Sequence, residues 1–155
     1  MNQPRPGDRR FQIVNYVGII DQLATNVANR VLAGADLPLA QFIMLNHFSH
    51  EPARGRTVME VARAFQAQQA GVTKVLQRLV RKGFLEVRQS PQDRRLRIHL
   101  LTGKGRQAHA EAVAALMPEV ARAFADWREE EIAQLHALLF RLKEWFDHDR
   151  DRADA

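Results

Sequence analysis

The stretch Thr57–Gly83, which reads TVMEVARAFQAQQAGVTKVLQRLVRKG, decides the fold. Thr57 and Glu60 stand three residues apart, as in a capping box, where the hydroxyl accepts a hydrogen bond from the first helical turn and the carboxylate reaches back to the cap. This spacing predicts a short helix from Thr57 to about Phe65. Its inward-facing side chains are Val58, Val61, Ala62 and Phe65.

A second helical run follows a tight turn in the same stretch. Its apolar positions are Val72, Val75, Leu76, Leu79 and Val80. The run ends at Gly83 after Arg81 and Lys82, and a glycine just past a basic last turn is typical of a helix end. The polar positions of this helix are Gln69, Thr73, Lys74, Gln77, Arg78 and Arg81. Two short helices with a polar, basic second member are typical of a helix-turn-helix that reads DNA.

After Gly83 the hydrophobic period changes from helical to alternating. The alternating apolar residues are Leu85 and Val87, then Leu96, Ile98 and Leu100. They predict two half-buried strands joined by a turn over Arg88–Arg95. Arg94 and Arg95 put two cations at the tip, where such a wing could reach a minor groove. A charged tip that serves only to keep the protein soluble remains the alternative.

Helical periodicity also predicts two helices before this core, over Phe11–Val31 and Pro38–Phe48. Gly34 ends the first of these helices, and Pro38 suits the first turn of the second. The segment His50–Arg56, with a proline and a glycine, breaks the pattern and is predicted to be a loop.

Two further helices are predicted after the hairpin. Thr102 caps the first of them, and Pro118 marks a kink or a break in it. Asp126 and Glu129 have the spacing of a capping box for the final helix. Its apolar stripe is Ile132, Leu135, Leu138, Leu139, Leu142, Trp145 and Phe146. The highly charged tail Asp147–Ala155 is expected to fray.

Charge is concentrated in the middle of the chain. Residues 54–106 hold 13 basic and 3 acidic residues, a net charge of +10, while the rest of the chain carries −5. A basic centre between acidic arms is typical of a protein that binds a polyanion, because phosphate neutralisation releases counterions. An ordinary solvated surface remains the alternative.

Several classes of protein are excluded by what the sequence lacks. It has no cysteine, so disulfides and thiolate metal sites are excluded. The N-terminus has no apolar signal region and no run is long enough to span a membrane, which predicts a cytoplasmic protein. No phosphate-binding glycine loop, nucleophile elbow or paired-carboxylate motif is present, so neither enzymatic activity nor a cofactor is expected. His47 and His50 leave a metal-responsive protein open, although a zinc site needs further ligands.

The order of the elements, and several motifs within them, resemble the MarR family of transcription regulators over Phe11–Phe146. Leu37–Phe42, LPLAQF, is similar to the start of the family's second helix, with Pro38 in place of a threonine. The pairs Val72-Thr73 and Arg78-Leu79, followed by Lys82-Gly83-Phe84-Leu85, resemble its recognition helix and the exit from it. Asp93-Arg94-Arg95 and Leu101–Arg106, LTGKGR, resemble its wing and the start of the next helix.

The resemblance implies a mainly α fold with a small β-hairpin wing, in a single MarR-like domain over residues 1–155. The winged helix-turn-helix lobe would span about 38–106, and dimerisation helices would span about 11–33 and 107–147. The implied function is that of a homodimeric repressor that binds a pseudo-palindromic double-stranded DNA operator sequence-specifically and is released by a small effector. A winged-helix module that binds protein and not DNA is the remaining alternative.

Helices present side chains near their N-terminus to base edges in the major groove. On this ground Gln69, Thr73, Lys74 and Gln77 are expected to read bases. Arg54, Arg56, Arg78 and Arg81 are expected to bind phosphates. By the resemblance Arg94 would enter the minor groove, while Asp93 and Arg95 would pair to hold the wing. The predicted DNA-binding set also includes Thr57, Gln68 and Ala70.

Two parts of the predicted sites are less well defined by the resemblance: the start of the DNA-reading helix and the effector cleft. Gln68–Gly71 stands where the family has small hydroxyl residues, and Gly71 within a helix costs about 0.5–1 kcal/mol relative to alanine. Either the helix starts later or the backbone approaches a neighbour closely there. The resemblance also implies a cleft for a small aromatic or phenolic effector. Its polar candidates are Asn15, Tyr16, His47 and His50, each of which can equally be a core residue.

Overall fold

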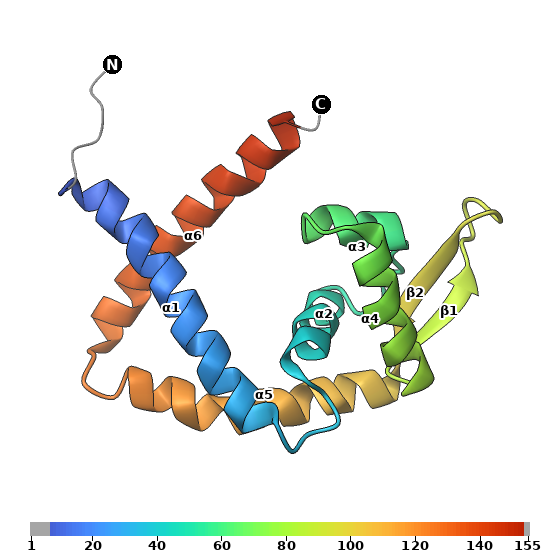
Figure 1. Cartoon of the computed structure of the whole chain (residues 1–155), viewed down its shortest axis with the longest axis horizontal. Helices are drawn as coiled ribbons and strands as arrows, with labels where there is room; N and C mark the ends of the chain where they lie inside the picture. The colour runs from blue at the N-terminus through green and yellow to red at the C-terminus, as the bar shows by residue number, and fades with distance from the viewer. Residues whose placement is uncertain (1–6, 154–155) are drawn as a thin grey trace. The chain divides into compact units, whose positions relative to one another are not determined.

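The structure is a computed structural model that describes residues 7–153. Its elements are α1 (Arg9–Leu32), α2 (Leu39–Ser49), α3 (Val58–Ala64), α4 (Gln69–Arg81), β1 (Leu85–Gln89), β2 (Arg97–Leu101), α5 (Gly103–Ala123) and α6 (Glu129–Ala153). The two strands form one antiparallel hairpin, so the predicted fold class is confirmed (Figure 1). None of the helices in this part of the chain is long and apolar enough to cross a membrane.

The chain packs as two compact units that divide between Met117 and Pro118. The division falls inside α5, because Pro118 is accommodated within this helix, which continues to Ala123. A break at Pro118 is therefore absent. The predicted organisation as one domain with a DNA-binding lobe and dimerisation helices stays a prediction.

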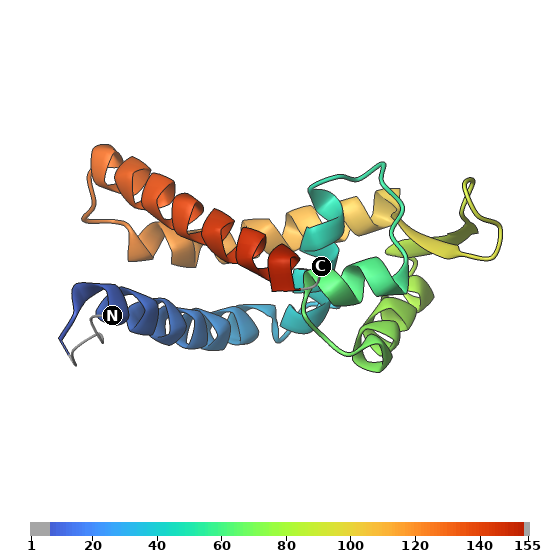
Figure 2. The same cartoon turned by 90° about the horizontal axis from the view of Figure 1, so that it is seen from above.

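The core of the first unit forms around α2. Phe48 and Leu45 of α2 are fully buried, and so are Leu76 and Leu79 of α4 and Leu85 at the start of β1. The helix-turn-helix pair and the hairpin therefore share one core with α2. Figure 2 shows the turn of the hairpin projecting beyond α4.

Local signals account for the helix-turn-helix. Glu60 N–H donates to Thr57 Oγ1 (3.2 Å), and Thr57 N–H donates to Glu60 Oε2 (2.7 Å), so the predicted capping box is confirmed. Between the two helices Gln66 adopts a φ of 48°, a left-handed conformation that reverses the chain in a tight turn. Gly83 takes a φ of 75° just after α4, as expected for the residue that ends a helix.

The hairpin pairs Leu85 with Leu101 and Val87 with His99. Its buried face on β2 consists of His99 and Leu101, while Leu96 precedes the strand and is exposed. The predicted half-buried strand is confirmed, but Leu96 lies outside it, and its most buried positions are His99 and Leu101, not the half-buried Ile98 and Leu100. The physical reason is the register of the hairpin, because Leu101 pairs with the fully buried Leu85 and His99 lies on the same face as Leu101.

Two predictions about the C-terminal helix also need correction. The reach-back bond at the start of α6 joins Arg128 N–H to Glu131 Oε2 (2.9 Å), not Asp126 and Glu129, because the helix begins at Glu129. The tail is helical to Ala153, since ion pairs such as Lys143–Asp147 (2.5 Å) support the last turns. Thr102 caps α5 as predicted, accepting from Gly105 N–H (3.0 Å).

Candidate nucleic-acid interface

The outward face of α4 carries the polar residues that the sequence predicts to meet DNA. Its buried side is formed by Val72, Leu76 and Leu79, which pack into the shared core. The exposed side chains on the opposite side are Ala70, Lys74, Gln77, Arg78 and Arg81. Gln68 is the N-cap residue of α4 and its side chain caps no amide. The first turn of α4 is therefore open to solvent.

Gly71 lies in this first turn and not in the helix interior. A Cβ built on Gly71 meets nothing within 4 Å, so no contact inside the protein requires a glycine there. Thr73 is half-buried, and its hydroxyl donates to the carbonyl oxygen of Gln69 (2.8 Å). Because the hydroxyl proton is used in this way, Thr73 can offer a base only its oxygen as an acceptor.

The tip of the hairpin is a tight turn built by Ser90 and Asp93. Ser90 Oγ accepts from the amides of Gln92 and Asp93, and Leu96 N–H donates to the carbonyl oxygen of Asp93 (3.0 Å). Asp93 Oδ1 accepts from the backbone N–H of Arg95 (2.9 Å). Asp93 thus orders the turn through the amide of Arg95, and the side chains of Arg94 and Arg95 are exposed at the tip.

A groove of about 1110 Å³ joins the hairpin to the helix-turn-helix within the first unit. It is lined by Arg54 and Thr57 before α3, by Gln69 at the start of α4, and by Arg95 of the hairpin turn. All four belong to the predicted DNA-binding set. The structure therefore brings together residues that lie in three separate segments of the sequence.

Sequence reasoning missed other residues that line this groove. Arg88 and Arg97 come from the two strands, and Met59, Leu96 and Ile98 add an apolar part. Both arginines lie on the hairpin and are exposed, whereas the turn predicted over Arg88–Arg95 placed Arg88 outside the strand. The excess of basic residues over 54–106 is the sequence signal that could have included them.

Arg54 is exposed, and its guanidinium forms ion pairs with two carboxylates. It pairs with Glu51 Oε2 (3.1 Å) and with Glu60 Oε1 (3.6 Å). The backbone amide of Thr57 lowers the pKa of Glu60 first of all, with smaller contributions from the Thr57 hydroxyl and from Arg54. Glu60 therefore stays ionised beside Arg54 at neutral pH.

Arg56 does not fit its predicted role as a phosphate contact. Its side chain is buried, with the whole residue 4% exposed, and its guanidinium pairs with Glu51 Oε2 (2.8 Å). Burial lowers the pKa of Arg56, while Glu51 opposes this shift. The guanidinium is therefore committed to the protein and is not available to a phosphate in this structure.

None of the four predicted effector residues lines the groove beside the hairpin. Asn15 and Tyr16 are exposed on α1. His47 packs edge-on against Phe65 (5.2 Å between ring centroids), and burial lowers its pKa. His50 is exposed and lies 3.4 Å from Asn46 Nδ2.

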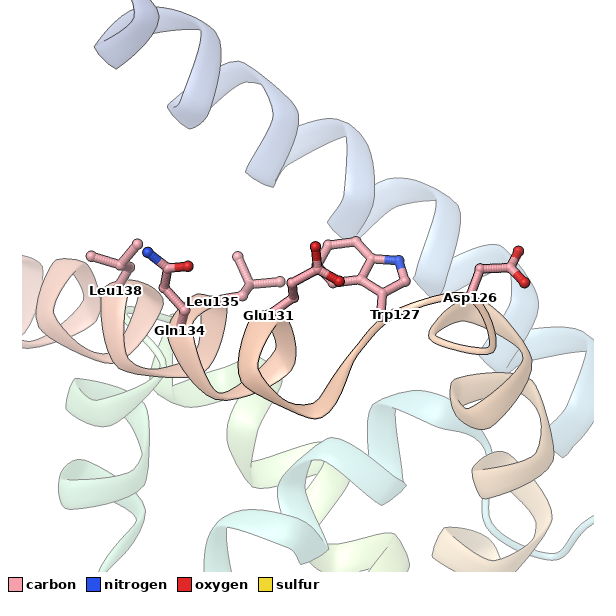
Figure 3. A pocket seen from close by; sticks show the side chains of 6 residues that line it. All are labelled: Asp126, Trp127, Glu131, Gln134, Leu135 and Leu138. Atoms are coloured by element: carbon pink, nitrogen blue, oxygen red, sulfur yellow. The ribbon is translucent and has the colours of Figure 1, made fainter.

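A shallow pocket of about 470 Å³ lies in the second unit (Figure 3). Trp127, Leu135 and Leu138 give it an apolar part, while Asp126 and Glu131 give it two carboxylates. Two carboxylates disfavour an anionic phenol, so this pocket gives no support to the predicted effector class. A third pocket of about 320 Å³ lies between Leu37, Phe84 and the first half of α5.

Residues 7–153 offer no set of metal ligands that would support the metal-responsive alternative. No group of three or more histidine, aspartate or glutamate side chains there could hold a metal ion. His99 and His109, which the sequence reasoning did not single out, are two buried or half-buried histidines of the first unit. His109 lies 2.8 Å from Asn46 Oδ1 and stacks on Phe42, so it joins α5 to α2.

Comparisons with known proteins agree with this architecture. The model of the MarR family matches residues 35–96, and a search of curated proteins found no significant match. A cysteine mutant of MarR from E. coli is 22% identical, with a TM-score of 0.72 over 91% of this chain and 98% of that one. BldR from Sulfolobus solfataricus, a transcriptional regulator, is 26% identical, with a TM-score of 0.71 over 89% of this chain and 99% of its own.

A further MarR structure covers more of the chain. It is 24% identical, covers 98% of both chains and has a TM-score of 0.79. The chain therefore has the MarR fold over nearly its whole length, and the model of the MarR family matches its segment 35–96, which holds the helix-turn-helix and the first strand of the hairpin.

Proposed function

We propose that this protein is a transcription regulator that binds double-stranded DNA sequence-specifically as a homodimer. The observation that carries the proposal is the groove in which Arg54, Thr57, Gln69 and Arg95 come together. A duplex that lies along this groove would meet the start of α4 and the hairpin at the same time, which is how a winged helix-turn-helix holds DNA.

The two parts of the interface would do different work. Lys74 and Gln77 are exposed on α4, with donors and acceptors that fit base edges in the major groove. Arg78 and Arg81 are exposed one turn further along, where a cation can neutralise phosphates without reading sequence. Arg94 at the tip would reach the adjacent minor groove.

Exposed apolar side chains on the outer helices support a homodimer. On α1 they are Phe11, Ile13, Val14, Tyr16, Val17, Ile19, Ile20 and Leu23, and on α6 they are Leu138, Leu139, Phe140, Trp145 and Phe146. Monomeric proteins rarely leave contiguous apolar patches of this kind in water. A two-fold dimer would also place two copies of α4 on successive major grooves of a pseudo-palindromic operator.

We further propose that the protein acts as a repressor that a small molecule releases from DNA. This part rests on the MarR family alone, since the described residues do not single out an effector pocket. A phenolic or aromatic compound that lowers affinity for the operator without changing affinity for random DNA would identify such an effector.

Binding to the DNA that flanks the protein's own gene tests the proposed function. Affinity for this DNA and for a random duplex should be measured between 50 and 200 mM salt. We expect tighter binding to the flanking DNA, and a loss of roughly 10³-fold or more over this range because several phosphates are neutralised. A protein that binds neither duplex at 50 mM salt would contradict the proposal and favour a protein-binding winged helix.

A further inference from the structure

Arg56 sits where the loop before α3 meets the second strand of the hairpin. Its backbone N–H donates to the carbonyl oxygen of His99 (3.0 Å), and His99 N–H donates back to the carbonyl oxygen of Arg56 (2.8 Å). Both residues are buried, at 4% and 7% exposed. The loop is thus fastened to the middle of β2.

The neighbouring glycine brings the two segments into close contact. A Cβ on Gly55 would lie 2.5 Å from Ile98 Cδ1, closer than real atoms approach. The loop therefore lies directly on the Ile98 side chain of β2, and a side chain at residue 55 would require Ile98 to move. Contact along Gly55 and Arg56 sets the position of β2 relative to the loop.

The guanidinium of Arg56 holds the same loop against the end of α2. It pairs with Glu51 Oε2 (2.8 Å), donates to the carbonyl oxygens of Arg54 (3.3 Å) and Glu51 (3.5 Å), and lies 5.3 Å from the ring centroid of Phe48. Phe48 is fully buried in the core that also holds α4. Arg56 therefore links β2 of the hairpin, through its backbone, to the core around Phe48 into which α4 also packs.

We propose that Arg56 is a positioning residue that sets the distance between α4 and the arginine-bearing tip of the hairpin on DNA, and that it does not bind phosphate itself. The proposal rests on the proposed DNA-binding function. Its physical basis is that a fork of donors held by Glu51 and two carbonyl groups fixes direction as well as distance. Without these contacts the loop is no longer held against the end of α2. The position of β2, and of the turn that precedes it, is then no longer fixed relative to α2.

The test is a double-mutant cycle between Arg56→Met and Arg94→Ala. Methionine keeps an unbranched apolar stem beside Phe48 and removes the fork. If Arg56 acts by placing the tip, Arg56→Met weakens operator binding about tenfold in the wild type, a typical effect of one lost contact. It then has little further effect once Arg94 has been removed, because the contact that it supports is already lost.

A direct phosphate contact gives different results. Arg56→Met and Arg94→Ala would then weaken binding by independent factors, and Arg56→Met would lower the slope of log K against log salt by about 0.9 with or without Arg94. Arg56→Lys would also recover full affinity, since lysine serves a phosphate as a point charge. The positioning role predicts only partial recovery by lysine. Either independent factors or full recovery would overturn the proposal.

Two further measurements keep the test sharp. Amide hydrogen exchange at His99 should quicken in Arg56→Met without DNA, because the guanidinium no longer holds the loop whose backbone pairs with His99. If Arg56→Met does not fold, Glu51→Gln takes its place in the cycle. Glu60→Gln is the matched control, because it removes a carboxylate from Arg54, keeps the helix cap, and should show no coupling to Arg94.

The outcome separates this inference from the function on which it rests. Wild-type protein that fails to bind operator DNA refutes the proposed function. Wild-type protein that binds, with unchanged operator affinity and unchanged His99 exchange in the folded Arg56→Met variant, refutes the positioning role alone.

Discussion

A Cβ on Gly105, in the first turn of α5, would lie 2.1 Å from the carbonyl oxygen of Phe84. Phe84 lies between α4 and β1, and the same carbonyl oxygen accepts from the backbone N–H of Thr102 (3.1 Å). The long helix α5 thus starts directly against the link between α4 and β1. The glycine fits here because its neighbour is a backbone atom, which a methyl group could displace only by shifting the chain.

Gly105→Ala should therefore lower the free energy of unfolding by about 1–3 kcal/mol, because the backbone of α5 or of Phe84 must shift to admit the methyl group. Urea denaturation monitored by circular dichroism measures this. Gly71→Ala is the matched control, since its methyl group meets open space. It should raise stability by about 0.5–1 kcal/mol through helix propensity. Equal effects of the two substitutions would contradict the contact with Phe84.

Stability should fall as pH drops from 7.5 to 5.5. Burial is the main cause that lowers the pKa of His47, His99 and His109 below the ordinary value of 6.5, with Arg56 adding to the effect at His47 and His50 at His109. The unfolded chain therefore takes up these protons first, so the stabilisation is complete above about 6.5 and is lost as pH falls toward the folded-state values.

Urea titrations at three pH values in this range check the prediction. Carboxylates with lowered pKa, such as Glu60, lose their contribution only at lower pH and do not interfere. His109→Gln keeps a donor for Asn46 and should reduce the pH dependence. A stability that is flat or rises toward pH 5.5 would refute the role of the buried histidines.

Lys74 and Arg78 should differ in what they contribute to DNA binding. Lys74→Ala should relax preference at one base position at a cost of about 1–3 kcal/mol, and Arg78→Ala should weaken specific and random DNA alike and lower the salt slope by about 1. Competition binding against operator variants measures both. Equal losses on specific and random DNA for both variants would remove the division of roles on α4.

The purified protein should elute as a dimer at micromolar concentration. An aspartate in place of Leu139 should shift it toward the monomer, because the charge would be buried against a partner. Glu130→Gln, which is on the same helix and exposed, is the control and should leave the dimer intact. A wild-type protein that is monomeric in sizing chromatography would contradict the dimer.

Local chemistry made the helix-turn-helix predictable from the sequence. Thr57 and Glu60 satisfy each other's backbone groups three residues apart, so no distant partner is needed to locate the start of α3. At α6 the same reasoning chose the wrong pair, since Arg128 and Glu131 make the reach-back bond two residues further along than Asp126 and Glu129. Sequence spacing alone does not distinguish two overlapping caps.

Long-range pairing accounts for what the sequence could not predict. The backbone of Arg56 pairs with His99, which lies far along the chain, and nothing near Arg56 indicates that partner. The register with β1 places His99 and Leu101 on the buried face of β2, whereas the apolar alternation follows Leu96, Ile98 and Leu100 on the other face. Membership of the DNA-binding set stays a prediction for the remaining residues.

Footprinting of both grooves of the operator, with wild-type protein and with Arg94→Ala, tests most directly whether α4 and the hairpin hold one duplex together. We predict that wild type protects major-groove positions and the adjacent minor groove, and that Arg94→Ala loses only the minor-groove protection. Unchanged minor-groove protection in Arg94→Ala, or protection confined to one groove in wild type, would contradict the shared interface.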